Sequence, residues 1–190
     1  VYKYTEEQLK EDMRLVQVIP HQRQIVYQEM EFFCFIHFTV NTYTGKEWGT
    51  GDEPENIFYP VKMDAKQWAK AAKDGGMKGM ILTCKHHDGF CMWDTKATDY
   101  NIINTPYGKD VIKMLADACK KHGLLLSIYY SNPDWHYEYG YNPESKSHQW
   151  GAKYKHQVDT IKLREFIKAQ ITELLTNYGD IYTLFWDIPP

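Results

Sequence analysis

Four short apolar runs that alternate with helical segments constrain the fold of this chain more than any other feature. Each run has the length and the aromatic and β-branched content of a buried strand, and each ends in polar or aromatic residues. The segments between them repeat apolar residues at helical spacing and stop at a glycine. Strands and helices in this order are typical of a parallel α/β fold. The strand-like runs are 31–38, 81–84, 123–130 and 180–187, and helices are expected at 5–18, 65–74, 110–122 and 160–178.

The second apolar run leads into the most informative motif of the chain. Lys85, His86, His87 and Asp88 follow it directly, and Gly89 can then turn the chain. In parallel α/β folds the carboxyl ends of the strands open onto a cleft that carries the chemistry. Two imidazoles, a carboxyl group and an amine therefore predict a hydrogen-bonding site. A solvated polar loop is the alternative interpretation of the same residues.

Aromatic residues make up 15% of the chain, with six Trp and fifteen Tyr, and many of them follow the strand-like runs. Sugars present flat C–H faces and rims of hydroxyl groups, so aromatic side chains beside carboxyl groups and imidazoles suit a carbohydrate ligand. The alternative is that these aromatic residues only pack loops onto the sheet. The residues concerned are Trp48, Trp93, Trp135, Tyr137, Tyr139 and Tyr141.

Composition narrows the class of protein further. The charged fraction of 25% and the hydrophobic fraction of 43% are typical of a globular domain, and no apolar run is long enough to span a bilayer. The net charge of −3 comes without a basic stripe, which disfavours nucleic acid as a partner. The cysteines show no C-x-x-C spacing and are expected to be buried free thiols. They are Cys34, Cys84, Cys91 and Cys119.

Several motifs, in order along the chain, closely resemble the catalytic domain of the retaining α-L-fucosidases of glycoside hydrolase family 29. The resemblance extends from about Pro20 to Asp187. It implies a (β/α)8 barrel of the TIM type, followed by a β-sandwich domain. The stretch from Asn41 to Gly49 looks most like the branch that prefers α-1,3- and α-1,4-linked fucose. The matching motifs are Phe35-Ile36-His37-Phe38, Asn41-Thr42-Tyr43-Thr44, Glu47-Trp48-Gly49, Met80-Ile81-Leu82-Thr83, Lys85-His86-His87-Asp88-Gly89-Phe90, Tyr129-Tyr130-Ser131 and Phe185-Trp186-Asp187.

The resemblance assigns roles to individual residues. It implies that Asp187 is the nucleophile, and that either Tyr129 or Tyr130, with Tyr130 preferred, contacts the fucose ring. Neutral imidazoles both donate and accept hydrogen bonds, and a carboxylate accepts from two hydroxyl groups, so physical chemistry agrees with a hydroxyl clamp. Phe185 stands where the family commonly has Trp, which leaves the aromatic wall of the site to be built differently. The other implied sugar ligands are His37, Glu47, Trp48, His86 and His87.

The four expected strands correspond to the first half of an eight-stranded barrel. We therefore expect the chain to be the N-terminal part of a longer catalytic domain, which the downstream half would complete. A retaining glycosidase also needs a second carboxyl group as general acid, which the family pattern places beyond Pro190. Glu47 is the alternative acid within the chain. On this interpretation residues 1–190 alone are inactive.

Two other functions fit part of the sequence. A metal-dependent barrel hydrolase would place His37, His86, His87 and Asp187 around zinc, although adjacent His86 and His87 would point to opposite faces of a regular strand. A sugar-binding protein without turnover would keep the pocket alone. The favoured hypothesis needs no metal or cofactor, and its partner is a fucosylated oligosaccharide or glycoconjugate. It leaves the compartment open, with a periplasmic or secreted location expected for a bacterial protein.

Overall fold

The structure, a computed structural model, describes residues 4–140 and 159–188. Contacts divide the chain into two compact units, Val1–Glu31 and Phe32–Pro190. The first unit holds two helices, α1 (Glu6–Val16) and α2 (Gln22–Met30). The helix expected at 5–18 is confirmed as α1, and its Thr5 forms a capping box with Gln8.

Helix α2 was not predicted from the sequence. Its N-cap is His21, whose side chain accepts a hydrogen bond from the backbone N–H of Arg23, while Gln24 closes the capping box. An imidazole is not among the residue types that usually mark a helix start, so the sequence carried no ordinary capping signal there.

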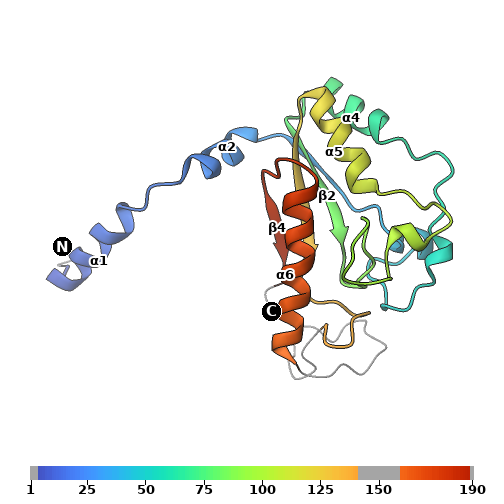
Figure 1. Ribbon diagram of the computed structural model, residues 1–190. Coiled ribbons are helices and arrows are strands. Elements are labelled where there is room, and N and C mark those ends of the chain that lie inside the picture. Colours follow the sequence, from blue (N-terminus) through green and yellow to red (C-terminus); the bar gives the residue numbers. More distant parts are fainter. Residues whose placement is uncertain (1–3, 141–158, 189–190) are drawn as a thin grey trace. The chain divides into compact units, whose positions relative to one another are not determined.

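The second unit is built on a four-stranded sheet in the order β1-β2-β3-β4, and all neighbouring strands run parallel (Figure 1). This confirms the parallel α/β prediction. Each strand pairs with the next one along the chain, so the carboxyl ends of all four meet at one end of the sheet. The strands are β1 (Phe33–Ile36), β2 (Gly79–Lys85), β3 (Leu125–Ser131) and β4 (Leu184–Asp187).

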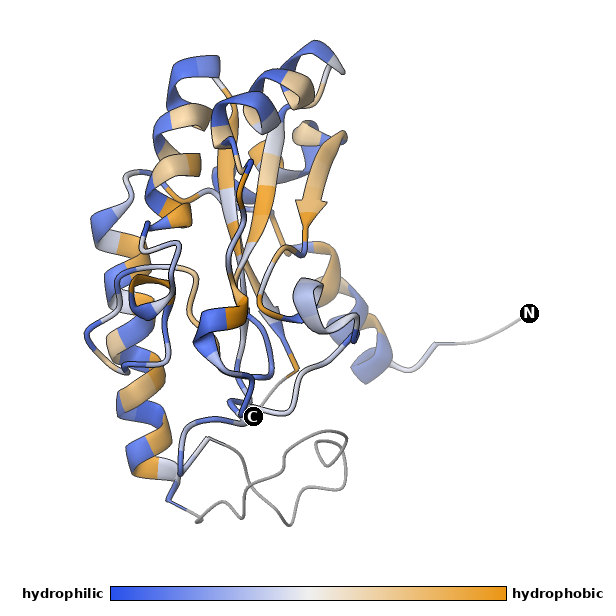
Figure 2. Cartoon of the chain, turned by 90° about the vertical axis from the view of Figure 1, so that its right-hand side faces the viewer, coloured by the Kyte–Doolittle hydropathy of each residue, from blue (hydrophilic) through white to orange (hydrophobic). Residues whose placement is uncertain are grey.

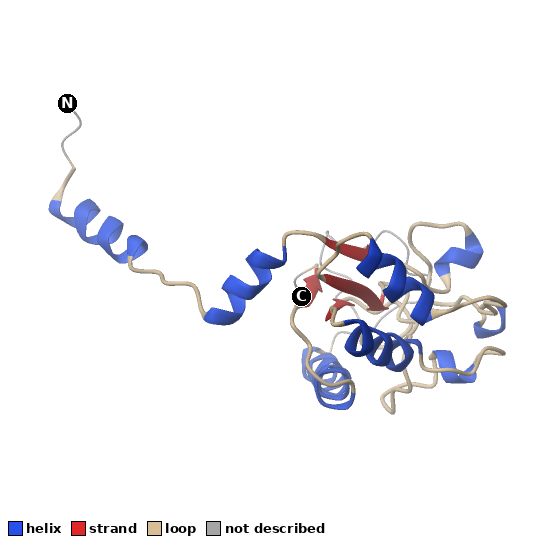
Figure 3. Ribbon diagram, turned by 90° about the horizontal axis from the view of Figure 1, so that it is seen from above, coloured by secondary structure: helices blue, strands red, loops and turns tan. Residues whose placement is uncertain are grey.

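The three long helices of this unit cover one face of the sheet (Figure 3). They begin at Asp64, Asp110 and Asp159, whose carboxyl groups accept hydrogen bonds from the first free backbone N–H groups. All three helices were predicted to within one residue. They are α4 (Ala65–Asp74), α5 (Val111–His122) and α6 (Thr160–Asn177), and the shorter elements are α3 (Asn41–Thr44), η1 (Glu55–Ile57) and η2 (Ile102–Asn104).

The two faces of the sheet differ in character. One face packs under the helices and forms the hydrophobic core, and much of each strand is orange, the colour of hydrophobic residues (Figure 2). The other face, here called the inner face, mixes aromatic and hydroxyl side chains, and Phe35 and Phe185 are 37% and 40% exposed on it. The core face carries Met80, Leu82, Cys84, Leu126, Ile128 and Tyr130, and the inner face carries Phe35, Ile81, Thr83, Ser127, Tyr129 and Phe185.

A β-bulge interrupts the alternation near the end of β2. Thr83 pairs with Tyr129 and Lys85 with Tyr130, so that Cys84 is the extra residue in the ladder. Cys84 lies in the core, and Lys85 also faces the helix side, where it meets Tyr130. The bulge therefore turns two successive side chains to the same face, as bulges near functional sites often do.

All four cysteines are free thiols, as predicted. Three of them are buried, and Cys34 on β1 is only partly so. Among the described residues, no helix is both long and apolar enough to cross a membrane.

Candidate active site

The carboxyl ends of the four strands bring together most of the residues that the sequence singled out. His37 follows β1, His86 and His87 follow β2, Tyr129 lies near the end of β3, and Asp187 ends β4. All five face the inner side of the sheet, and the rings of His37 and His86 each lie within 5.6 Å of Tyr129. They form one cluster, which we call the carboxyl-end site.

The Asp187 carboxyl group is held from two sides. The Tyr129 hydroxyl donates a hydrogen bond to Asp187 Oδ2, and His87 Nε2 lies 3.6 Å from the same oxygen. Burial, and then the bond to Asp187, raise the pKa of Tyr129 well above its usual value, so this hydroxyl stays a donor. The Asp187 side chain is 34% exposed, so the carboxyl group is oriented and still accessible.

Two further imidazoles border this carboxyl group. The His37 Nδ1 atom lies 2.7 Å from Thr83 Oγ1, and the His86 ring stacks on Tyr129. Burial, and then the neighbouring His87 and His37, lower the pKa of His86 to about 3, although Asp187 opposes the shift. His37 is more open to solvent, yet partial burial also lowers its pKa against the pull of Asp187. Both rings are therefore neutral near pH 7.

The loop after β1 forms the wall of a hollow of about 390 Å³ beside these rings. Glu47 is exposed and Trp48 is partly buried, and both line the hollow together with His37 and His86. The hollow is also lined by Thr39, Asn41, Thr42, Gly45 and Lys46. Four of the predicted sugar ligands thus border one cavity.

Tyr130 is not in this cluster. Its side chain lies on the core face, where its hydroxyl donates to Gln170 Oε1 at 2.7 Å and accepts from Lys85 Nζ at 3.0 Å. The strand alternation places Tyr129 on the inner face instead, so the structure brings Tyr129, and not the preferred Tyr130, to Asp187. Lys85 is also fully buried and pairs with Asp134 Oδ2 at 3.1 Å, away from the hollow.

The aromatic residues separate into two groups. Phe185 stacks on Tyr129 and meets the edge of Phe35, so Phe185 lines the inner face, whereas the adjacent Trp186 lies beside Tyr130. The other aromatic residues contribute to packing. Trp93 is buried and donates a hydrogen bond to Glu173, whereas Tyr137 stacks on Phe166 and also contacts Tyr139. Tyr141, and the Pro189-Pro190 pair at the end of the chain, lie outside the described residues.

Several contacts that support the site could not be predicted from the sequence, because they join residues from separate segments of the chain. Asn41 Nδ2 donates to Asp88 Oδ2 at 2.7 Å, and the backbone N–H of Trp135 donates to the His87 carbonyl at 2.8 Å. A side chain at Gly89, where φ is +87°, would collide with Asp134. Burial raises the pKa of Asp88 to about 7, although the Phe90 N–H opposes the shift. The cue available in the sequence was the position of these residues just after strands.

Among residues 4–140 and 159–188, no group of three or more His, Cys, Asp and Glu side chains has the arrangement of a metal site. The imidazoles of the carboxyl-end site instead contact Thr83, Ser131 and Tyr129. The arrangement can donate and accept hydrogen bonds around a small polar ligand and can present one carboxyl group for attack.

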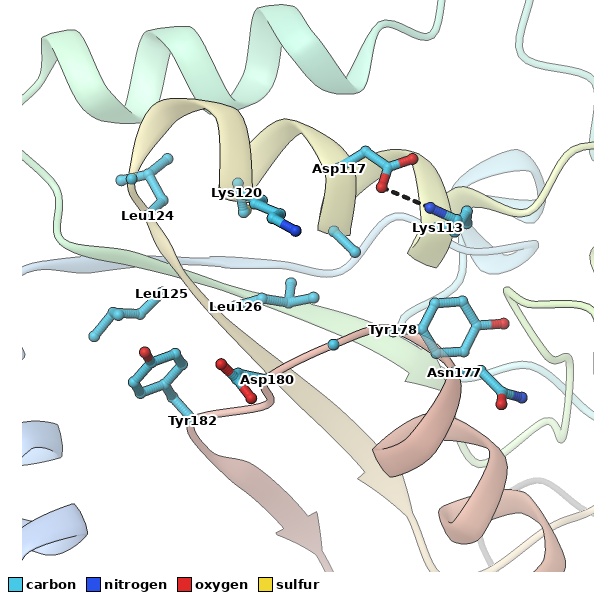
Figure 4. A pocket seen from close by; sticks show the side chains of 14 residues that line it. Lys113, Asp117, Lys120, Leu124, Leu125, Leu126, Asn177, Tyr178, Asp180 and Tyr182 are labelled. Atoms are coloured by element: carbon cyan, nitrogen blue, oxygen red, sulfur yellow. Dashed lines mark hydrogen bonds and ion pairs between the residues drawn. The ribbon is translucent and has the colours of Figure 1, made fainter.

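A larger hollow of about 540 Å³ lies at the opposite, amino end of β3 (Figure 4). Its wall consists of the surface of α5, the start of β3 and the segment between α6 and β4. Lys113 and Asp117 form an exposed ion pair on it, and Tyr178 donates to Asp110 Oδ2 at 2.7 Å. We call it the amino-end hollow, and none of the residues that the sequence singled out as ligands lies there.

Comparison with known proteins identifies the family. The model of the α-L-fucosidase family matches residues 26–189. α-L-Fucosidase 1 of Arabidopsis thaliana is 38% identical over 173 residues, which cover 89% of this chain and 31% of that protein. A family 29 glycoside hydrolase from an unknown rumen bacterium is 38% identical with a TM-score of 0.75, over 90% of this chain and 28% of its own.

The α-L-fucosidase isoenzyme 1 of Paenibacillus thiaminolyticus is 37% identical with a TM-score of 0.79, over 89% of this chain and 43% of that one. The chain thus spans about a third of the length of the curated relative from Arabidopsis. These relatives have TIM-barrel catalytic domains, and the parallel sheet described above agrees with the first strands of such a barrel. The chain belongs to the α-L-fucosidases of glycoside hydrolase family 29.

Proposed function

We propose that this chain carries the nucleophile and the fucose pocket of a retaining exo-α-L-fucosidase. The observation that carries the proposal is the Asp187 carboxyl group, which is oriented at the end of β4 by Tyr129 and lies beside His87. In the proposed reaction Asp187 attacks the anomeric carbon of a terminal fucose. The bond to the leaving oxygen breaks, that oxygen receives a proton, and water later hydrolyses the fucosyl-Asp187 ester.

The contacts of the carboxyl group suggest which oxygen attacks. The Tyr129 hydroxyl donates to Oδ2, which stabilises charge on that atom. We therefore assign the attack to Oδ1. We assign to Tyr129 the role that was predicted for Tyr130, because of the two only Tyr129 lies on the inner face.

The remaining contacts of the sugar follow from its chemistry. We assign the ring hydroxyl groups to His37, Glu47, His86 and His87, because imidazole and carboxyl groups supply both acceptors and donors. Fucose has a methyl group in place of a 6-hydroxyl, and an apolar wall suits it. We assign that wall to aromatic residues, with Trp48 in the hollow and Phe35 and Phe185 on the inner face.

The proposal places the general acid outside residues 1–190, in the remainder of the barrel, with a β-sandwich domain after it. Glu47 then serves as a hydroxyl ligand. Residues 1–190 alone would be inactive, since general acid catalysis contributes about 10²–10⁴-fold to the rate.

The natural substrate would be a fucosylated glycan, and the stretch from Asn41 to Gly49 supports a preference for α-1,3 and α-1,4 linkages. Comparing turnover of α-1,2-, α-1,3-, α-1,4- and α-1,6-fucosides tests that preference.

Replacing Asp187 with glycine in the natural full-length protein tests the central assignment. We expect turnover of an aryl α-fucoside to fall by several orders of magnitude with the fold intact, and azide to restore part of it by attacking in place of the carboxylate. Asp180→Gly is the control, because Asp180 belongs to the exposed segment before β4 and should leave turnover unchanged. Normal turnover in Asp187→Gly would refute the assignment.

The stereochemistry of the product is a second test. Retention requires that proton NMR shows α-fucose as the first product, whereas first appearance of β-fucose would indicate direct attack by water. A full-length protein that binds fucose tightly without any turnover would instead support a sugar-binding function.

A further inference from the structure

We propose that Ser131 is a positioning residue that holds His87 as the Nδ1–H tautomer, so that His87 Nε2 faces Asp187 as a hydrogen-bond acceptor. The inference deepens the proposed function and rests on it for the role of Asp187. Its structural part, the hydrogen on His87 Nδ1, stands on the geometry alone, and the neutral ring with a lone pair on Nε2 belongs to the proposal.

The hydroxyl of Ser131 has two polar neighbours. Ser131 Oγ lies 2.6 Å from His87 Nδ1 and 2.8 Å from the backbone oxygen of Pro133. A carbonyl oxygen can only accept, and a hydroxyl group has one hydrogen, so that hydrogen points to Pro133. Ser131 Oγ must then accept from His87, which places a hydrogen on Nδ1. Ser131 is fully buried, so water does not compete for these bonds.

The tautomer determines what His87 presents to the nucleophile. A neutral imidazole with its hydrogen on Nδ1 carries a lone pair on Nε2. This atom lies 3.6 Å from Asp187 Oδ2, beyond the range of a direct hydrogen bond. Two acceptors that face each other favour a donor between them, and because Oδ2 already accepts from Tyr129, the hydrogen of that donor goes to Nε2. A hydroxyl group of the sugar, close to the carbon that Asp187 attacks, has that chemistry.

The backbone of His87 has a contact of its own that does not involve the Ser131 side chain. The backbone N–H of Trp135 donates to the His87 carbonyl at 2.8 Å, and the Trp135 ring lies 5.4 Å from the imidazole. Removing the Ser131 hydroxyl should therefore release the tautomer of the ring without displacing the main chain. This separates a positioning role from a general role in folding.

The chain offers a matched control on the same strand. Ser127 lies on the same face of β3, is equally buried, and its hydroxyl has no hydrogen-bond partner among the described residues. Ser127→Ala and Ser131→Ala therefore remove the same atoms from neighbouring positions, but only the second variant removes a contact to His87.

The test combines ¹⁵N NMR of histidine side chains with steady-state kinetics on the natural full-length protein, with His87→Gln identifying the His87 signals. We expect a protonated Nδ1 and an unprotonated Nε2 in the wild type and in Ser127→Ala, and loss of that pattern in Ser131→Ala. The value of kcat/KM for an aryl α-fucoside should fall about 10- to 100-fold in Ser131→Ala only.

A hydrogen on Nε2 in the wild type, or an unchanged pattern in Ser131→Ala, would overturn the inference. The wild-type spectrum decides the tautomer even if Ser131→Ala does not fold. Absence of fucosidase activity in the wild type, with the Nδ1–H tautomer present, would refute the proposed function and leave the tautomer assignment standing.

Discussion

The two hollows at opposite ends of the sheet differ in size and in the kind of residue that lines them. The amino-end hollow is the larger, at about 540 Å³ against about 390 Å³ for the hollow of the carboxyl-end site. Two of its ionic residues, Lys113 and Asp117, belong to one helix and neutralise each other at the surface. The carboxyl-end site draws its residues from the ends of four strands and from the loops that follow them.

The larger hollow is thus not the one that is lined by the predicted ligands. Side chains at the carboxyl-end site are oriented by buried partners, as the contacts of Thr83 with His37 and of Ser131 with His87 illustrate. An orienting layer of this kind costs stability unless every polar group in it is satisfied. The presence of such a layer distinguishes the carboxyl-end site from the amino-end hollow. Matched substitutions at the two ends of the sheet test this difference.

The largest expected effect concerns two lysine–aspartate pairs. Lys85→Met should lower the free energy of unfolding by about 3–5 kcal/mol, because Asp134 would remain buried without its cation. Lys113→Met, which breaks the exposed pair with Asp117, should change it by less than about 1 kcal/mol. Chemical denaturation of both variants measures the difference. Equal losses would mean that the buried pair has no special structural role.

The next effect concerns two tyrosine–aspartate hydrogen bonds. Tyr129→Phe removes the donor to Asp187 and should lower kcat/KM by about 10- to 100-fold, as expected for a bond to a charged group worth about 1.5–3 kcal/mol. Tyr178→Phe removes the bond to Asp110 at the amino-end hollow and should leave kcat/KM unchanged. Aryl α-fucoside kinetics distinguish the two variants, and a similar loss in both would remove the functional contrast between the hollows.

The effect that is smallest for a single step of one pH unit is a dependence of stability on pH beneath the carboxyl-end site. Burial raises the pKa of Asp88 to about 7 in the folded protein, so folding favours its protonated form. The resulting stability is fully present below about pH 4 and is lost as the pH rises from there through about 7, by up to about 1.4 kcal/mol per pH unit.

Asp88→Asn mimics the protonated form, and Asn41 Oδ1, which has no partner among the described residues, can accept from the new amide. The variant should therefore gain stability relative to the wild type as the pH rises from 5 to 8. Denaturation curves at several pH values measure the gain, and a constant difference between the two proteins would show that Asp88 does not titrate in this range.

The long helices and the sheet could be predicted because their signals are local. Each long helix of the second unit starts at an aspartate, Asp64, Asp110 or Asp159, and its end is followed closely by a glycine. The strands of a parallel sheet, which are buried on their helix side, appear in the sequence as short apolar runs. Their order along the chain was then sufficient for the topology.

The details of the site could not be predicted because they depend on strand phase and on distant loops. Tyr129 and Tyr130 are equivalent in sequence, and only the pairing of β3 with β4 shows which one faces Asp187. For the same reason the sequence did not show which face of the sheet Phe35 and Leu82 would occupy, and the structure places them on opposite faces. Contacts such as that of Ser131 with His87 join residues 44 positions apart, which no local pattern reports.

The bulge at Cys84 has a consequence for the charge of the pocket. In a regular strand with the same residues, Lys85 would face inward and His86 would turn to the helices. An ammonium group would then border the ligand, and such a pocket would favour acidic or sulfated sugars over a neutral deoxy sugar such as fucose. The choice between these ligand classes thus depends on one extra residue in a strand ladder, and comparisons by residue identity alone would overlook it.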